Sequence, residues 1–160
     1  MPVTGCMEPA NLPVAVQPAD DNESFLSRFE HCTLPESEWS HLAHVRVAWL
    51  YLSHESPDAA LRKICDGILR YNTEVLHRPE KYSETVTVAF VHIVLGRMQP
   101  AEPWNAFAAS IDDLLDPQKP VLLNYYSKDR LFSDEARNCF VEPDLMKLPC
   151  FDVFDPACKT

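Results

Sequence analysis

Glycine and basic residues are scarce in this chain, and each shortage excludes a class of function. The 160 residues include 3 glycines, and neither GxGxxG nor GxxxxGK[ST] occurs. The chain therefore lacks the glycine-rich loops whose backbone amides hold nucleotide phosphates. The chain has 14 Lys and Arg residues and 24 Asp and Glu residues, which gives a formal net charge of -10. Because polyphosphate binding needs a basic face that displaces counterions, we expect no nucleic-acid partner and no binding to anionic membranes.

Paired cysteines and long apolar runs are missing as well. The 6 cysteines form no CxxC pair, so a structural zinc site built on cysteine is not expected. Residues 1–23 have neither the basic start nor the apolar run of a signal peptide, and no apolar stretch is long enough to cross a membrane. We therefore predict a cytoplasmic protein with free thiols, in which Cys65 and Cys139 are small core residues.

Proline divides the chain into three parts. Residues 1–23 hold four prolines, four acidic residues and no Lys or Arg, a composition typical of a disordered leader. Residues 149–160 are expected to form an extended tail. Between them, residues 24–148 leave three long windows without proline, where long helices can lie. The predicted fold is all-α, a single irregular bundle of five to seven helices.

Each window carries its own helix signal. The first, Glu36–Ser56, is nearly uncharged in its second half, which is typical of a central helix. The second begins with Ser56 as N-cap and Pro57 in the first turn. The third contains a TVTV run that would also suit a strand, but its length and the N-cap Ser83 favour a helix. Shorter helical segments are expected at Pro103–Leu115, Val121–Tyr126 and Ser133–Phe140, followed by extended chain from Val141.

The first motif with chemical potential is a histidine pair, His41 and His44, in the first window. Three residues turn an α-helix by roughly 300°, so the spacing predicts that both imidazoles project from nearly the same side. Neutral imidazole is a common ligand of Fe, Zn, Cu and Mn, and two on one turn provide half a metal site. The alternative is that two histidines share this spacing by chance and are merely buried.

The second motif is YSETVT, residues 82–87, at the start of the third window. Glu84 there either interacts favourably with the helix dipole or serves as a third metal ligand or a general base beside the histidine pair. His92 lies about 12 Å further along the helix axis and is expected to be a hydrogen-bonded core histidine. The remaining histidines, His31, His54 and His77, are expected at the surface or as capping residues.

A third cluster contains Tyr126, Ser133 and Arg137. The Arg137 guanidinium could hold a substrate carboxylate through two parallel hydrogen bonds, with Tyr126 helping to orient the substrate. The structural alternative is that Arg137 ties the last helix to an acidic neighbour, such as Asp134 or Glu84.

Three segments of the chain resemble a family of small, uncharacterised bacterial-type proteins: LPESEWSHLAHVRVAWLYL, KYSETVTVAF and LLDPQKPVLLNYYSKDRLFSDEARNCFVEPDL. That family is recognised by a W-x-H-x-x-H-[VL]-x-V-A helix, a Y-H-E-T-x-T segment and an L-x-S-x-x-A-R-x-x-F-V-x-P-D stretch. The resemblance extends over residues 25–148. It implies no particular reaction, because the family has no settled activity.

The resemblance implies a set of matching positions and one departure. The residues that match the family pattern are His41, His44, Tyr82, Glu84, Thr85, Ser133 and Arg137. The departure is Ser83, which stands where the family pattern has histidine. If that histidine is a metal ligand in the family, a metal site here has one ligand fewer, unless Glu84 carries that role.

Three functional hypotheses follow from these residues. In the first, His41, His44 and Glu84 line a pocket and hold a divalent metal (Fe, Zn, Cu or Mn) that activates substrate, water or oxygen, while Tyr82, Thr85, Tyr126 and Arg137 orient a small organic substrate. In the second, a metal-independent isomerase, cyclase or lyase uses a histidine as general base with Glu84 as its orienter. In the third, the chain is a non-catalytic module that binds a small ligand or a protein. Each of the three hypotheses is compatible with a homodimer.

Overall fold

The computed structural model describes residues 18–154, and every regular element in that range is helical. This confirms the predicted all-α fold. The helices, with the 3-10 turns marked η, are α1 (Pro18–Glu30), η1 (Glu36–Glu38), α2 (His41–His54), α3 (Pro57–Glu74), η2 (Pro79–Lys81), α4 (Glu84–Arg97), α5 (Trp104–Ala109), α6 (Asp112–Leu115), η3 (Val121–Asn124), α7 (Lys128–Leu131), α8 (Asp134–Asn138) and η4 (Phe151–Val153).

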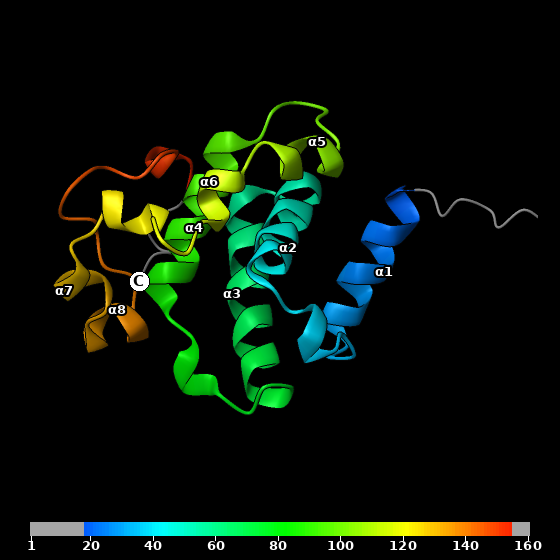
Figure 1. The fold of residues 1–160 in the computed structure, drawn as a ribbon, viewed down its shortest axis with the longest axis horizontal. Helices are drawn as coiled ribbons and strands as arrows, with labels where there is room; N and C mark the ends of the chain where they lie inside the picture. Colours follow the sequence, from blue (N-terminus) through cyan, green and yellow to red (C-terminus); the bar gives the residue numbers. More distant parts are fainter. Residues whose placement is uncertain (1–17, 155–160) are drawn as a thin grey trace, which may run out of the picture.

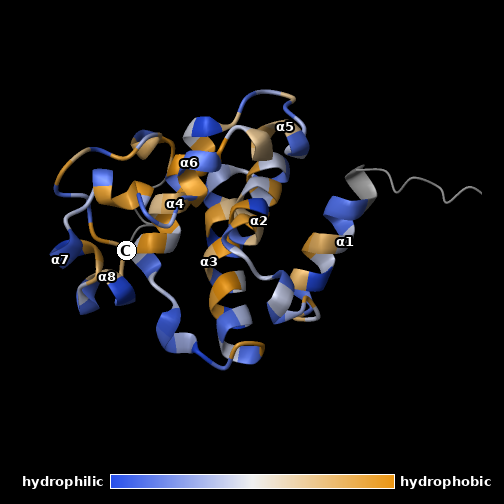
Figure 2. Ribbon diagram, in the orientation of Figure 1, coloured by the Kyte–Doolittle hydropathy of each residue, from blue (hydrophilic) through white to orange (hydrophobic). Residues whose placement is uncertain are grey.

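The centre of the molecule is a bundle of α2, α3 and α4, which pack against one another (Figure 1). Helix α1 covers α2 and α3 on one side, whereas α8 packs against α4 on the opposite side. Apolar residues concentrate on the central helices, and α7 and α8 are largely hydrophilic (Figure 2). The two outer helices α1 and α8 therefore cover different flanks of one apolar bundle.

Serine caps begin the central helices as the sequence predicted. The Ser56 hydroxyl oxygen accepts the Ala59 N–H at the start of α3. The Ser83 oxygen accepts the Val86 N–H at the start of α4, so the segment with the TVTV run is a helix and not a strand. Because capping satisfies an otherwise unpaired N–H, these serines fix where each helix begins.

Two short elements of the structure differ from the prediction. The segment expected as one helix from Pro103 to Leu115 is divided into α5 and α6 at Ser110, whose hydroxyl donates to the Phe107 carbonyl and ends the first helix. Helix α7 was not expected, because a single turn is too short to show helical periodicity. Its N-cap is Ser127, which accepts the Arg130 N–H.

Both ends of the described chain are more ordered than the composition suggested. Helix α1 begins inside the predicted leader, and Arg46 of α2 holds it through Asp21 and Asn22, with N···O distances of 2.8 and 2.7 Å. In the predicted extended tail, Phe154 is buried and its ring centroid lies 4.4 Å from that of His92. The other parts of the predicted leader and tail, residues 1–17 and 155–160, lie outside the described residues.

Side chains satisfy the backbone of the segment that follows α8. The Thr85 hydroxyl donates to the Cys139 carbonyl (2.9 Å) and accepts the Val141 N–H (3.0 Å). The Tyr126 hydroxyl donates to the Val141 carbonyl (2.8 Å). Thr85 and Tyr126 are both 0% exposed. Buried backbone groups without a regular partner thus occupy both hydroxyls, so the functional roles predicted for Thr85 and Tyr126 stay predictions beside this structural role.

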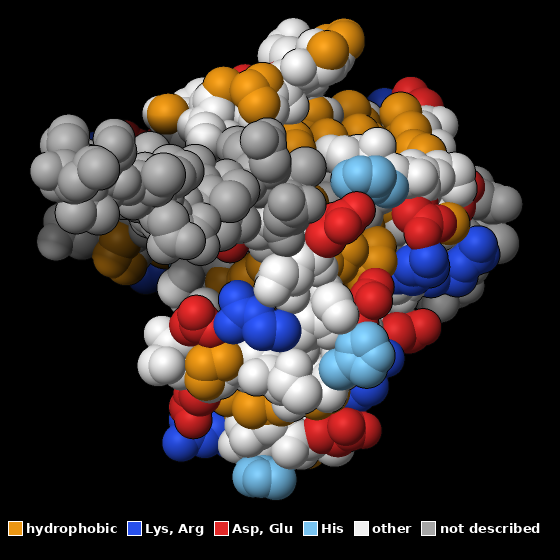
Figure 3. Space-filling view, turned by 90° about the vertical axis from the view of Figure 1, so that its right-hand side faces the viewer, with side chains coloured by type: hydrophobic (Ala, Val, Ile, Leu, Met, Phe, Trp, Pro, Cys, Tyr) orange, Lys and Arg blue, Asp and Glu red, His pale blue; other side chains and the backbone are white. Residues whose placement is uncertain are grey.

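One face of the molecule carries charges of both signs. On the face shown in Figure 3, acidic and basic side chains are interspersed, and the basic ones do not gather into a patch. Among residues 18–154, no helix combines the length and the hydropathy that a membrane span requires.

We expect Thr85→Val to lower the free energy of unfolding, although the two side chains have nearly the same shape. The substitution keeps the shape of the side chain but leaves the Val141 N–H buried without an acceptor, at a cost of about 1–3 kcal/mol in the free energy of unfolding. Urea denaturation followed by circular dichroism measures the change. Thr87→Val is the control, because the Thr87 hydroxyl donates only to the Ser83 carbonyl of its own helix. An equal loss in both variants would contradict the role assigned to Thr85.

Candidate functional site

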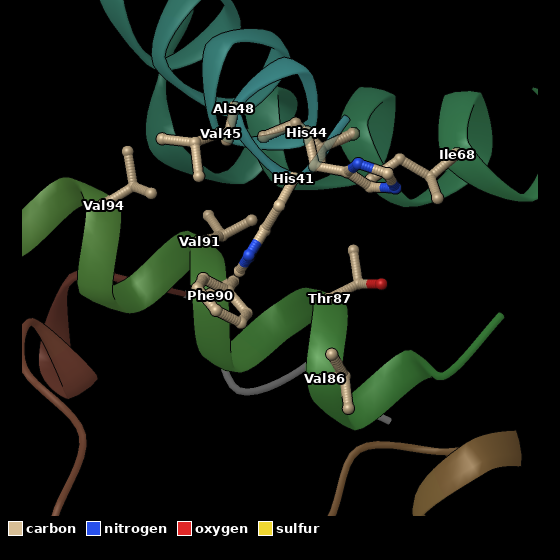
Figure 4. A pocket seen from close by; sticks show the side chains of 11 residues that line it. His41, His44, Val45, Ala48, Ile68, Val86, Thr87, Phe90, Val91 and Val94 are labelled. Carbon is tan, nitrogen blue, oxygen red and sulfur yellow. The ribbon is translucent and has the colours of Figure 1, made fainter. Parts of the chain in front are cut away.

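Two adjoining cavities lie beside α4. The first, which we call the apolar cavity, has a volume of about 320 Å³ between α2, α3 and α4, and aliphatic side chains form most of its wall (Figure 4). Its polar wall residues are His41, His44 and Thr87. The size and the apolar wall are typical of a site for a small organic molecule.

The second, which we call the polar cavity, has a volume of about 460 Å³ and extends from α3 and η2 to α7 and α8. Its wall includes Asn72, Lys81, Tyr82, Ser133 and Arg137. The two cavities share four wall residues, which are His44, Ile68, Val86 and Thr87. One imidazole, that of His44, therefore faces both compartments.

His44 is held in a defined orientation. Its Nδ1–H donates to the Ser40 carbonyl over 2.7 Å, so in the neutral ring Nε2 carries the free lone pair. The ring lies on the Trp39 indole, with the centroids 3.9 Å apart. Burial lowers the pKa of His44 to about 4; the bond to Ser40 opposes this shift, and nearby His41 adds to it. His44 is therefore a neutral, oriented hydrogen-bond acceptor at pH 7.

His41 points elsewhere. Its ring meets the Phe90 ring of α4 edge-on, with the centroids 5.1 Å apart, and burial lowers its pKa. The close-up shows the His41 ring reaching toward Phe90, whereas the His44 ring turns toward Ile68 of α3 (Figure 4). Both histidines line the apolar cavity, in keeping with their spacing, but their rings lie against different neighbours.

Glu84 does not join the histidines. Its carboxylate accepts the Tyr82 hydroxyl, and it lies near the Cys65 thiol, whose pKa is raised to about 12 by burial and by this carboxylate. Glu84 lines neither cavity. Within residues 18–154, no three His, Cys, Asp or Glu side chains are placed to hold a metal ion together. The predicted ligand set of His41, His44 and Glu84 is not assembled, because the Tyr82 hydroxyl engages the carboxylate.

The structure brings four of the positions singled out in the sequence together in the polar cavity, namely His44, Tyr82, Ser133 and Arg137. The Tyr82 hydroxyl is occupied by Glu84, whereas Arg137 is exposed. Arg137 forms no ion pair with any described residue, so the alternative bond to Asp134 or Glu84 is absent.

Most of the third family-like segment has a structural role. Ser133 caps α8 by accepting the Ala136 N–H, and Ala136 is fully buried. The Asp144 carboxylate accepts both the backbone N–H and the hydroxyl of Ser127 at the start of α7. These bonds fix the segment that carries Arg137. The residues of this motif therefore shape the wall of the polar cavity, whether or not they also contact a ligand.

Asn72 is a wall residue that the sequence reasoning missed. It is 6% exposed, and among the described residues its carboxamide has no hydrogen-bond partner. Asn72 continues the register of Ile64 and Ile68 along the buried face of α3. A polar residue on an apolar stripe was therefore the signal that could have found it. Lys81, an exposed residue of η2, gave no such signal.

No family model, no curated protein and no solved structure matches this chain. The resemblance to the motif-defined bacterial-type family therefore stays a prediction, and no relative indicates the chemistry of the two cavities.

The low pKa of His44 gives stability a defined pH dependence. The folded chain resists protonation of His44 down to about pH 4, whereas the unfolded chain takes up that proton near pH 6.5. Unfolding therefore binds a proton between these values, and stability falls as the pH drops through them, by up to about 3 kcal/mol for this group.

We expect His44→Gln to remove this part of the acid destabilisation in urea denaturation series between pH 7 and 4. His54→Gln is the matched control, because His54 makes the same Nδ1 bond to a carbonyl one turn back on α2 and lines neither cavity. Parallel pH curves for the wild type and His44→Gln would show that burial does not hold His44 neutral.

Proposed function

We propose that this chain is a metal-independent enzyme that moves a proton on a small organic molecule, with His44 as the general base. The single observation that supports this is the orientation of His44 at the junction of the two cavities. Its Nδ1 is engaged by the Ser40 carbonyl, which leaves Nε2 as the acceptor. The backbone carbonyl thus takes the orienting role that was predicted for Glu84.

The reaction class that suits one oriented base is isomerisation, cyclisation or elimination. Nε2 takes a proton from a carbon next to a carbonyl, the C–H electron pair moves into the new C–C double bond, and the carbonyl oxygen takes the negative charge. In isomerisation or cyclisation, the imidazolium then returns the proton to a different atom of the same molecule. In elimination, the bond to the leaving group breaks as the double bond forms, and the imidazolium gives the proton to the departing group. No oxidant, reductant or second substrate is needed, and the shared wall of the two cavities gives the substrate room on either side of His44.

A histidine with a pKa near 4 is a weak base in the free protein. A negative charge bound nearby favours the imidazolium and raises this pKa, so the base gains strength only when a substrate is present. The same low pKa favours the second candidate, a non-catalytic module in which Nε2 merely accepts a hydrogen bond from a ligand. The two candidates differ in whether a carbon-bound proton exchanges.

Hydrogen exchange at carbon tests the proposal without knowledge of the product. The protein is incubated in D₂O containing EDTA with a panel of small ketones, keto acids and unsaturated acids, and deuterium uptake is measured by NMR. We expect uptake beside the carbonyl of at least one compound, reduced by about 100-fold or more in His44→Gln, since general base catalysis typically contributes that much. His54→Gln is expected to match the wild type.

Three outcomes contradict the proposal. Exchange that is unchanged in His44→Gln assigns the chemistry to another group. Exchange that EDTA abolishes and a divalent metal restores supports the metal-dependent hypothesis. Saturable binding of panel members without exchange of any of them supports the binding module.

A further inference from the structure

We propose that the ligand of this site is an organic monoanion with an apolar body, whose carboxylate lies against Arg137 in the polar cavity and whose body fills the apolar cavity. This inference deepens the proposed function and uses the same site. It rests on four features of the two cavities, which are the guanidinium without an acidic partner, the charge balance of the wall, the carboxamide of Asn72 on that wall and the aliphatic lining beyond His44.

Arg137, like Arg70, Arg78 and Arg130, forms no ion pair with a described acidic residue, but of these four it alone lines the polar cavity. Arg28, Arg46 and Arg97 each form an ion pair with an Asp or Glu at N···O distances of 2.7 to 2.8 Å. Arg137 has no such partner among the described residues, although the chain holds 24 acidic residues. A planar guanidinium at a cavity wall matches a carboxylate through two parallel hydrogen bonds.

The charges on the polar cavity wall favour one negative charge and not several. Arg137 and Lys81 are positive and Glu80 is negative, and all three line the cavity. One anionic group balances this wall, whereas a second one would lie in a cavity that already contains the Glu80 carboxylate. The absence of a glycine-rich loop argues in the same direction, because multiple phosphates are usually held by backbone amides.

Asn72 supplies an independent indication of a polar ligand. Asn72 is 6% exposed and lines the polar cavity, and no described residue bonds to its carboxamide, whose nitrogen and oxygen stay accessible from the cavity. A ligand oxygen in the cavity can therefore accept an N–H of this carboxamide. The carboxamide and the guanidinium come from α3 and α8, so a carboxylate between them joins two separate elements of the wall.

The apolar cavity suits the other end of such a molecule. Its wall is mostly aliphatic, and the Thr87 hydroxyl is already used by the Ser83 carbonyl. Because His44 lies at the junction, its Nε2 faces the part of the ligand where the charged group joins the apolar body. The carbons next to a carboxylate held by Arg137 are therefore those within reach of the proposed base.

Binding of simple carboxylates tests this inference apart from catalysis. Sodium acetate, butyrate, hexanoate and octanoate are titrated into ¹⁵N-labelled protein by NMR, with 1-octanol as the neutral counterpart. We expect saturable shifts with octanoate and an affinity that rises roughly fourfold for each methylene buried. Arg137→Gln is expected to weaken octanoate by about tenfold or more and to leave 1-octanol unchanged.

Arg78→Gln is the matched control, because the substitution removes the same charge from an exposed residue that lines neither cavity. It is expected to bind octanoate as the wild type does. Equal weakening in both arginine variants, an affinity independent of chain length, or no saturable octanoate binding would each overturn the inference.

The result also separates this inference from the proposed function. Octanoate binding that depends on Arg137, with no carbon exchange in the D₂O panel, upholds the ligand class and rejects the general base. Carbon exchange confined to neutral ketones and unaffected by Arg137→Gln upholds the base and rejects the anion.

Discussion

The hydrogen bonds that Thr85 and Tyr126 make with the backbone of Cys139 and Val141 are the constraint on which the site depends. The chain after α8 forms no regular structure until η4, so its buried N–H and C=O groups need side-chain partners. Thr85 on α4 and Tyr126 after η3 provide them. Because α8 directly precedes this segment, the same bonds hold Arg137 beside α4 and thereby close the wall of the polar cavity.

The second important interaction is the one that orients His44. The Ser40 carbonyl and the Trp39 ring fix the imidazole from two sides, and burial keeps it neutral. Protonating it would add a positive charge to a cavity wall where Lys81 and Arg137 already outweigh Glu80. A bound anion reverses this balance. The charge of the ligand and the basicity of His44 are therefore coupled through the shared cavity.

Local signals in the sequence predicted local structure well. The caps Ser56 and Ser83 and the proline-free windows placed α3 and α4 correctly, since capping and helix periodicity involve only neighbouring residues. His92 was expected as a hydrogen-bonded core histidine and is fully buried, with Nδ1 3.1 Å from the Pro149 carbonyl. Helix α1 was not predicted; Arg46, which anchors its first part, is distant in the sequence.

Residue type and spacing alone thus determined the helical class, the helix starts and the short list of chemically capable residues. Only the tertiary structure decided which of them meet. His41 and His44 have the spacing of a pair, yet their torsions direct one ring toward Phe90 and the other toward Ile68. Glu84 is engaged by Tyr82, whereas Asn72 and Arg137, far apart in sequence, share a cavity. The physical reason is that a functional site is set by side-chain torsions and long-range packing, and helical periodicity constrains neither.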